Sequence, residues 1–221
     1  LHTIVLGKGE HQIDSNNCLE ISSAVRIVGN PEVPKEKIVV LGGIEFTRGI
    51  QGNCRLQHLT IRQANLAQGH GPMMLGVWHG VRGRSACTMK DVVVEHCGSG
   101  VFARGTGVVG RCIDVEVRQC GWSGVNASNG ASLTLIGAKT TVHHNCTNGK
   151  SRDHGLAVYR SSSSTIQLVS PLTKEQVSLD NGGGGNWGAT NGGDINQIKT
   201  IDAPAISSSS SAQAGETKSI H

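Results

Sequence analysis

The sequence predicts an all-β protein, and more narrowly a β-solenoid with coils of about 23–36 residues, from two observations. The stretch VVVEHCGSGVFARG (92–105) is followed by the similar VEVRQCGWSGVNASNG (115–130), with Cys97 and Cys120 23 residues apart. Each copy joins a short alternating apolar run to a Gly/Ser/Asn break, which is typical of a strand and a turn. Further copies end at Ala64 and Cys146, and a weaker fifth copy ends at Gly182, so that the five copies are separated by 33, 23, 26 and 36 residues. A single coil of this size cannot bury its apolar face alone, so the repeat predicts stacked coils.

The first 50 residues add a resemblance to a known superfamily. HTIVLGKGEHQI (2–13), LEISSAVRIVGNP (19–31) and KIVVLGGIEF (37–46) resemble the opening coils of right-handed parallel β-helix proteins, the pectate-lyase-like superfamily. The pattern extends over roughly residues 2–182, and the resemblance implies a right-handed parallel β-helix. We therefore expect the following organisation: opening coils in 1–50, regular coils in 51–182, a Gly-rich terminal coil or cap in 183–206, and a disordered tail in 207–221.

Composition restricts the classes of partner. The 31 glycines, with only three tryptophans, one tyrosine and two phenylalanines, suit many tight turns and a core of stacked aliphatic side chains. The net charge of +4 permits an anionic partner without requiring one. We expect no nucleic-acid partner, because no basic run is interleaved with aromatics, and no membrane span, because no apolar run approaches 18 residues. The oligomeric state is left open.

Seven cysteines are an odd number, and Cys97, Cys120 and Cys146 are predicted to form an interior ladder in successive coils. No CxxC or paired Cys/His spacing indicates a metal site. Unpaired thiols favour an intracellular location, whereas the sequons at Asn126 and Asn145 argue weakly against it. A polar ladder that caps turns is expected one position earlier: Gln63, His96, Gln119, Asn145 and Asn181.

One candidate site is a row of carboxylates. If Val92 and Val94 face inward, then Asp91, Val93 and Glu95 face solvent. The next coil adds Asp114, Glu116 and Arg118 at the matching places. Asp91 and Asp114 would lie one coil apart, close enough to share a proton or bind Ca²⁺.

The resemblance implies that such acidic clusters can act on polysaccharides, with Arg118 stabilising developing negative charge. Two observations favour a structural interpretation. The signs of Arg62, Glu95 and Arg118 alternate down one column, as in a simple charge ladder. Of the superfamily's pectin-cleaving motifs, only a GHG at 69–71 occurs. We expect no cofactor, with Ca²⁺ reserved for the enzyme hypothesis.

The other candidate is an exposed aromatic face. GVWHG (76–80), GVFARG (100–105), GVNASNG (124–130) and GLAVYR (155–160) form a second repeated column. If the residue after each Gly points inward, the next one points outward, and the aromatics gather on one surface. The predicted ligand-binding residues are Trp78, Phe102, Arg104, Trp122 and Tyr159.

Exposed aromatic rings beside Arg and Asn suit a sugar ring or a protein partner, although loops or another chain could also cover them. The sequence thus favours a non-catalytic carbohydrate- or protein-binding module that uses this aromatic face. The alternative is a polysaccharide-active enzyme (a lyase, hydrolase or epimerase) that uses the stacked carboxylates. Fold alone does not separate the two.

Overall fold

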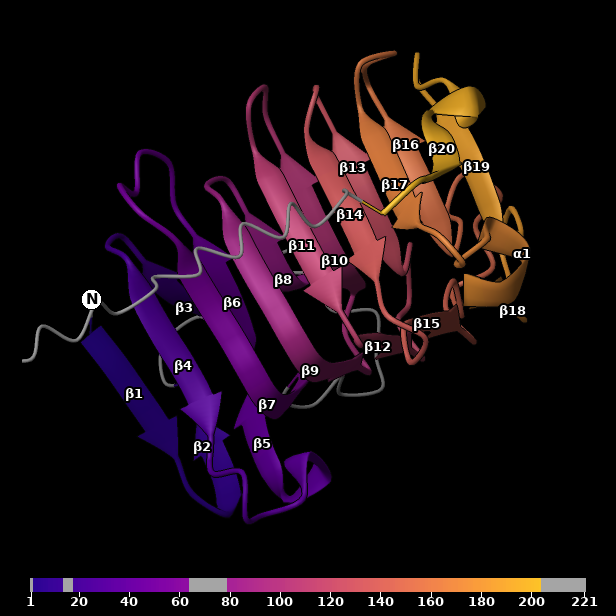
Figure 1. Cartoon of the computed structure of the whole chain (residues 1–221). Helices are drawn as coiled ribbons and strands as arrows, with labels where there is room; N and C mark the ends of the chain where they lie inside the picture. Colours follow the sequence, from indigo (N-terminus) through magenta and orange to yellow (C-terminus); the bar gives the residue numbers. More distant parts are fainter. Residues whose placement is uncertain (1, 14–17, 64–78, 204–221) are drawn as a thin grey trace, which may run out of the picture.

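The computed structural model describes residues 2–13, 18–63 and 79–203. Short parallel strands stack in two sheets, one of 13 strands and one of seven, so the all-β expectation is confirmed. Figure 1 shows strands that are far apart in the sequence lying side by side along one axis, from indigo to yellow. This arrangement is consistent with a β-solenoid.

Successive coils present three outward surfaces, which we call the first, second and third faces. The first face contains β1 (His2–Leu6), β4 (Val25–Gly29), β7 (Cys54–Arg62), β9 (Cys87–Glu95), β11 (Val109–Ile113), β14 (Ser132–Ile136), β17 (Thr165–Val169) and β20 (Ile198–Ile201). The second face contains β2 (Gly9–Gln12), β5 (Ile38–Leu41), the last residues of β7 and β9, β12 (Glu116–Arg118), β15 (Thr141–His143) and β18 (Ser178–Leu179). The third face is the seven-stranded sheet of β3 (Cys18–Ile21), β6 (Gly43–Phe46), β8 (His79–Gly83), β10 (Ser99–Arg104), β13 (Val125–Ser128), β16 (Leu156–Tyr159) and β19 (Trp187–Thr190). Helical structure in the described residues is limited to α1 (Lys174–Val177) and two 3₁₀ turns, η2 (Lys35–Lys37) and η3 (Ile195–Gln197), and no helix there could span a membrane.

A residue in the left-handed conformation bends each central coil between the first and second faces. His58, Asp91 and Asp114 hold φ of 54°, 53° and 53° at equivalent places in three consecutive coils. The bend changes which side of the strand is buried, so that Cys87 and Met89 face the core before Asp91, and Val92 and Val94 face it afterwards. This conformation is costly for most L-residues but is tolerated by Asp and Asn, which can bond locally.

Glu95 does not face solvent as expected: the residue is only 3% exposed. Its neighbours in the register are Arg62 and Arg118, as predicted. Arg62 Nε donates to Oε1 at 2.9 Å, and Arg118 Nε donates to Oε2 at 2.8 Å. The two guanidinium groups cover the carboxylate, so the predicted charge ladder is confirmed and explains the burial.

The predicted cysteine ladder is wrong at its third position. Arg118 pairs with His143, which places Asn145 rather than Cys146 next to Cys120. The amide of Asn145 accepts a hydrogen bond from Cys120 N at 3.1 Å and donates one to the Val117 carbonyl at 3.0 Å. Asn145 therefore caps a turn, as predicted, and it is hydrogen-bonded to Asn181 of the next coil. Its place in the repeat is that of Cys120, not the preceding position where the polar ladder was expected. All seven thiols are free.

Glycine is required where β10 meets the neighbouring coil. A Cβ atom at Gly100 would overlap with the Val117 side chain and with the carbonyl oxygen of Gly124. Gly124 is similarly confined by Val142 and by the carbonyl oxygen of Gly155. The repeated glycine of the second column thus allows close approach of the coils rather than an unusual φ.

The segment expected to form a terminal coil contributes strands to both sheets. Trp187–Thr190 pairs with β16, and Ile198–Ile201 pairs with β17, in parallel register. The apolar side chain of Ile198 is buried, so this coil closes the described core. The predicted tail at 207–221 lies outside the described residues.

Candidate functional site

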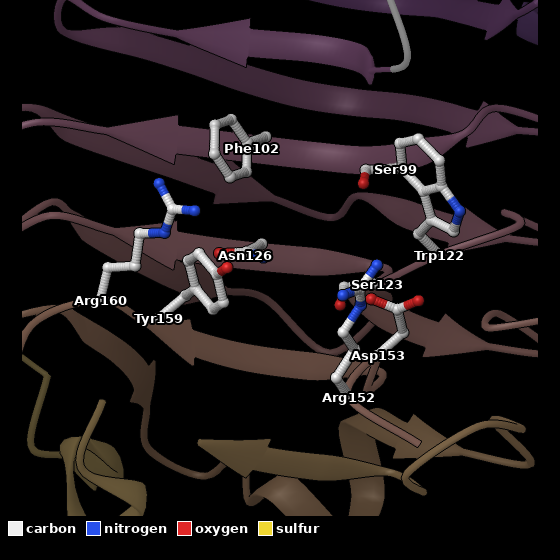
Figure 2. Close-up of a pocket in the computed structure, with 9 residues that line it drawn as sticks. All are labelled: Ser99, Phe102, Trp122, Ser123, Asn126, Arg152, Asp153, Tyr159 and Arg160. Carbon is white, nitrogen blue, oxygen red and sulfur yellow. The ribbon is translucent and has the colours of Figure 1, made fainter. Parts of the chain in front are cut away.

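A cleft of ≈390 Å³ lies on the third face and spans three coils. Its floor and walls include Phe102 from β10, Asn126 from β13 and Tyr159 from β16. Trp122 lines it from the turn before β13. In Figure 2, Trp122 and Ser99 lie on one side of the view and Phe102, Tyr159 and Arg160 on the other.

The register explains how these side chains meet. Phe102 pairs with Asn126, and Ser128 pairs with Tyr159, in adjacent parallel strands. The residues that alternate with them, Val101 and Val125, are buried in the core. Side chains in between therefore point outward, as the sequence pattern predicted.

The position opposite Phe102 that was predicted for Trp78 is occupied by Arg82. Val81 pairs with Val101 and Arg82 pairs with Phe102, so GVRG (80–83) is the true copy of the repeat rather than GVWHG. Arg82 is engaged in an ion pair with Glu45 at 3.2 Å. Trp78 itself lies outside the described residues.

Three of the five predicted ligand-binding residues line the cleft: Phe102, Trp122 and Tyr159. Arg104 is two residues beyond Phe102 on β10 and is not among the lining residues. The cleft adds polar residues that were not predicted as ligand-binding: Ser99, Ser123, Asn126, Arg152, Asp153 and Arg160. Arg152 and Asp153 occupy the turn before β16, the place that Trp122 holds before β13. That repeat position was the one signal that could have identified them.

Charge in the cleft is mixed. Burial raises the pKa of the Asp153 carboxyl above its ordinary value, although Arg152 and Lys150 oppose the shift. Burial also acts to raise the pKa of the Tyr159 phenol, but hydrogen bonds from Arg160 and Asn191 outweigh it and lower that pKa. Asp153 is the one carboxylate among the lining residues, against two arginines.

Two of the aromatic rings are already covered on one side by cations. The Arg160 guanidinium lies 4.9 Å from the centre of the Tyr159 ring, and Lys150 Nζ lies 5.7 Å from that of Trp122. Such contacts hold the rings in place at modest energetic gain. Asn126 Oδ1 is buried and accepts no hydrogen bond from any described residue, so a polar acceptor remains unsatisfied at the cleft.

The predicted carboxylate row lies elsewhere and is largely engaged in structural contacts. Asp91 accepts a hydrogen bond from Lys35 Nζ at 2.7 Å and lies 2.6 Å from His58 Nδ1. Burial would raise the pKa of Asp91, but these two partners lower it overall, which does not suit a carboxyl that must hold a proton. Asp114, at the matching place one coil on, accepts from the backbone N–H of Lys139 at 3.3 Å.

Glu116 and Arg118 continue the charge ladder of the second face. Arg118 Nη1 donates to Glu116 Oε1 at 2.9 Å, and His143 Nε2 lies 3.1 Å from the same oxygen. Burial lowers the pKa of Arg118, but its acidic partners outweigh this and raise it. None of the four predicted catalytic residues lines the cleft.

Within the described part of the chain, no group of three or more His, Cys, Asp or Glu side chains is placed to hold a metal ion. Comparison of the chain with protein-family models, with curated proteins and with solved structures finds no match. The cleft and its chemistry are therefore the basis for a functional conclusion.

Proposed function

We propose that the protein is a non-catalytic module of the right-handed parallel β-helix type that binds carbohydrate in the cleft of the third face. The supporting observation is the combination in one concave site of three aromatic side chains and several short polar ones. Right-handed coils are proposed because strand–crossover–strand connections between parallel strands are nearly always right-handed. The proposed relation to the pectate-lyase-like superfamily rests on the opening coils.

The size and lining of the cleft favour a sugar over a protein partner. Its volume of ≈390 Å³ lies within the range of about 300–1,000 Å³ that holds small ligands. A sugar ring has apolar faces that stack on aromatic rings and a rim of hydroxyls that need donors and acceptors. Ser99, Ser123 and Asn126 supply such groups beside Phe102 and Trp122.

The balance of charge favours sugars that carry an acidic group. Arg152 and Arg160 line the cleft against the single carboxylate of Asp153, and Lys150 lies over Trp122. An arginine fork matches a planar carboxylate geometrically. Acidic and neutral sugars should therefore be compared directly.

A glycan array with and without Ca²⁺, followed by calorimetry on any hit, tests this proposal. Trp122→Ala should weaken binding by about tenfold, because loss of one stacked ring is worth about 0.5–1.5 kcal/mol beyond its buried area. Arg104→Ala is the control: Arg104 lies on the same strand as Phe102 but outside the cleft. Absence of any glycan ligand, or equal affinity of Trp122→Ala and wild type, would reject the cleft as a sugar site.

An enzymatic role is the second candidate, because burial raises the pKa of Asp153 toward that of a general acid. Glycoside hydrolysis usually needs two carboxyls flanking the scissile bond, and the cleft lining supplies one. Any hit should be assayed for new reducing ends and unsaturated products, with Asp153→Asn and Asp91→Asn compared. Products would replace the binding proposal, and the variant that abolishes them would identify the site.

A further inference from the structure

The outward surface of the first face contains a continuous row of basic and neutral polar side chains. The pairing registers place these residues opposite one another in consecutive strands: Thr3, Arg26, Arg55, Thr88, Arg111, Thr134, Gln167 and Lys199. The adjacent outward row is Val5, Val28, Gln57, Lys90, Ile113 and Ile136. Neither row contains an aspartate or a glutamate. Figure 1 shows the strands that carry both rows stacked side by side.

Five cations on these rows, Arg26, Arg55, Lys90, Arg111 and Lys199, define what we call the basic face. Within residues 2–13, 18–63 and 79–203, none of these five side chains forms an ion pair or a side-chain hydrogen bond. Arg26 Nε and Arg55 Nε are in addition buried donors without an acceptor there. The basic face therefore carries positive charge that this part of the chain does not neutralise.

Four arginines on the other two faces form ion pairs with acids. On the second face, Arg62 and Arg118 share the carboxylate of Glu95. On the third face, Arg82 of β8 and Arg84, which follows the end of that strand, share Glu45. These four arginines are neutralised by acids of the same coil or a neighbouring one, whereas the three arginines of the basic face lie in rows that contain no acid.

An uncompensated row of this kind costs stability. Arg26 and Arg55 are direct neighbours in adjacent strands, and like charges so placed repel. Between β4 and β20 the row spans six strand-to-strand steps of about 4.8 Å, or about 29 Å along the solenoid. An extended anion with several charges would relieve the repulsion along this whole length, whereas a small anion would relieve it at one point only.

We propose that the basic face is a second binding site, distinct from the cleft, for a linear acidic polysaccharide lying along the solenoid axis. Thr88, Thr134 and Gln167 lie between cations of the same row and offer hydrogen bonds to sugar hydroxyls. The two rows contain no aromatic side chain, which disfavours single-stranded nucleic acid, because such sites stack bases on aromatic rings. The aliphatic neighbours Ile113 and Ile136 are half-buried, and the exposed Val5 lies at the end of the row, which disfavours a membrane surface as the partner.

Two kinds of variant test the basic face, with polygalacturonate and heparin as the acidic probes and dextran as the neutral one. Arg55→Gln combined with Arg111→Gln removes two central charges and should weaken binding of the acidic probes by about tenfold. Thr88→Glu places an acid between those arginines, so it should abolish binding while leaving the unfolding midpoint unchanged or raised. Thr88→Glu keeps the test decisive if the double variant is poorly folded.

Matched controls separate this site from general charge and from the cleft. Lys37→Gln combined with Lys139→Gln removes the same charge from exposed positions outside both rows, and should leave the affinity within about twofold. Trp122→Ala should leave binding of polymer by the basic face unchanged. Addition of about 1 M salt, which shortens the Debye length to about 3 Å, should release the acidic probes.

The proposal is overturned if Arg55→Gln with Arg111→Gln binds like wild type, or if the Lys37/Lys139 control loses as much affinity. It is also overturned if duplex DNA binds as tightly as the acidic polysaccharides with the same dependence on Arg55 and Arg111. That last result would show a surface for polyanions in general rather than for a glycan.

Discussion

Replacing Glu95 by Gln should destabilise the protein more than any other single loss of charge that the structure describes. Glu95 is 3% exposed, and its carboxylate accepts charge-assisted hydrogen bonds from both Arg62 and Arg118. Loss of one partner of a buried ion pair costs about 3–5 kcal/mol, because the remaining charge is left uncompensated. The Arg62 and Arg118 side chains are 39% and 33% exposed and can be rehydrated, so the lower limit of about 3 kcal/mol applies. In a chain of this length that corresponds to a melting temperature lower by about 6–12 °C.

Chemical unfolding of Glu95→Gln should be compared with that of Glu32→Gln, which removes an exposed acid and should stay within about 0.5 kcal/mol of wild type. The dependence on pH gives a second check. Burial would raise the pKa of Glu95, but its arginine partners outweigh burial and lower it below the ordinary 4.5. The stabilisation is therefore fully present above about pH 4.5 and is lost as the pH falls through the lower folded-state value, so the variant and wild type should converge in acid. If Glu95→Gln unfolds within 0.5 kcal/mol of wild type at about pH 7, the ladder does not stabilise the fold and the reasoning is refuted.

Three further predictions follow from the packing of the coils. Gly100→Ala should lower the unfolding free energy by about 1–3 kcal/mol through overpacking, whereas Gly7→Ala, where a Cβ meets nothing within 4 Å, should be nearly neutral; thermal melts would distinguish them. Asn145→Ala should cost about 1–3 kcal/mol in denaturant unfolding, because it leaves buried backbone groups without partners; an unchanged midpoint would contradict the capping role. The hydrogen bond with Asp91 raises the pKa of His58 above 6.5, so the stabilisation is complete below that pH and is lost as the pH rises through the folded-state value. His58→Gln should therefore differ most from wild type at about pH 5.5 and least at about pH 8.5, and a difference that grows with pH would exclude this linkage.

The period-two pattern and the 23-residue repeat were sufficient to predict stacked parallel strands and the register of Arg62, Glu95 and Arg118. Burial of Glu95 was not predictable from alternation, because alternation tells which side of the strand a residue occupies and not what covers it. The two arginine side chains that cover it are long and come from neighbouring coils. Their pairing was visible in the sequence, but its effect on accessibility was not.

The errors in register have a common cause. A coil of unequal length can contain two candidates for one position of the repeat, and spacing alone does not choose between them. GVWHG and GVRG both fit the interval before GVFARG, and only strand pairing identifies Val81 as the partner of Val101. In the same way Cys146 fits the repeat by identity, whereas Asn145 fits it by hydrogen bonding.

Part of the cleft was predictable and part was not, for a physical reason. Phe102 and Tyr159 lie on strands, where alternation fixes their direction, so the outward aromatic surface followed from sequence. Arg152 and Asp153 lie in a turn, whose conformation has no period and whose side chains can point in several directions. The position of Arg152 and Asp153 in the cleft depends on the backbone conformation of the whole turn.

Because the coils are stacked, the signs of the charges in each row of side chains indicate whether the row is structural or binds a ligand. Side chains at one place in successive coils lie about 4.8 Å apart, so every charged residue in a row has two fixed neighbours. In a row of alternating sign, such as Arg62, Glu95 and Arg118, the charges neutralise one another, so the row requires no ligand. A row of one sign, such as that of Arg26 and Arg55, is repulsive in the isolated molecule, and it is stable there only because stacked aliphatic residues hold the coils together. Thr88→Glu should therefore remove the affinity for polyanions while leaving the unfolding midpoint unchanged or raised, whereas a row with a purely structural role would show the same midpoint and no loss of binding.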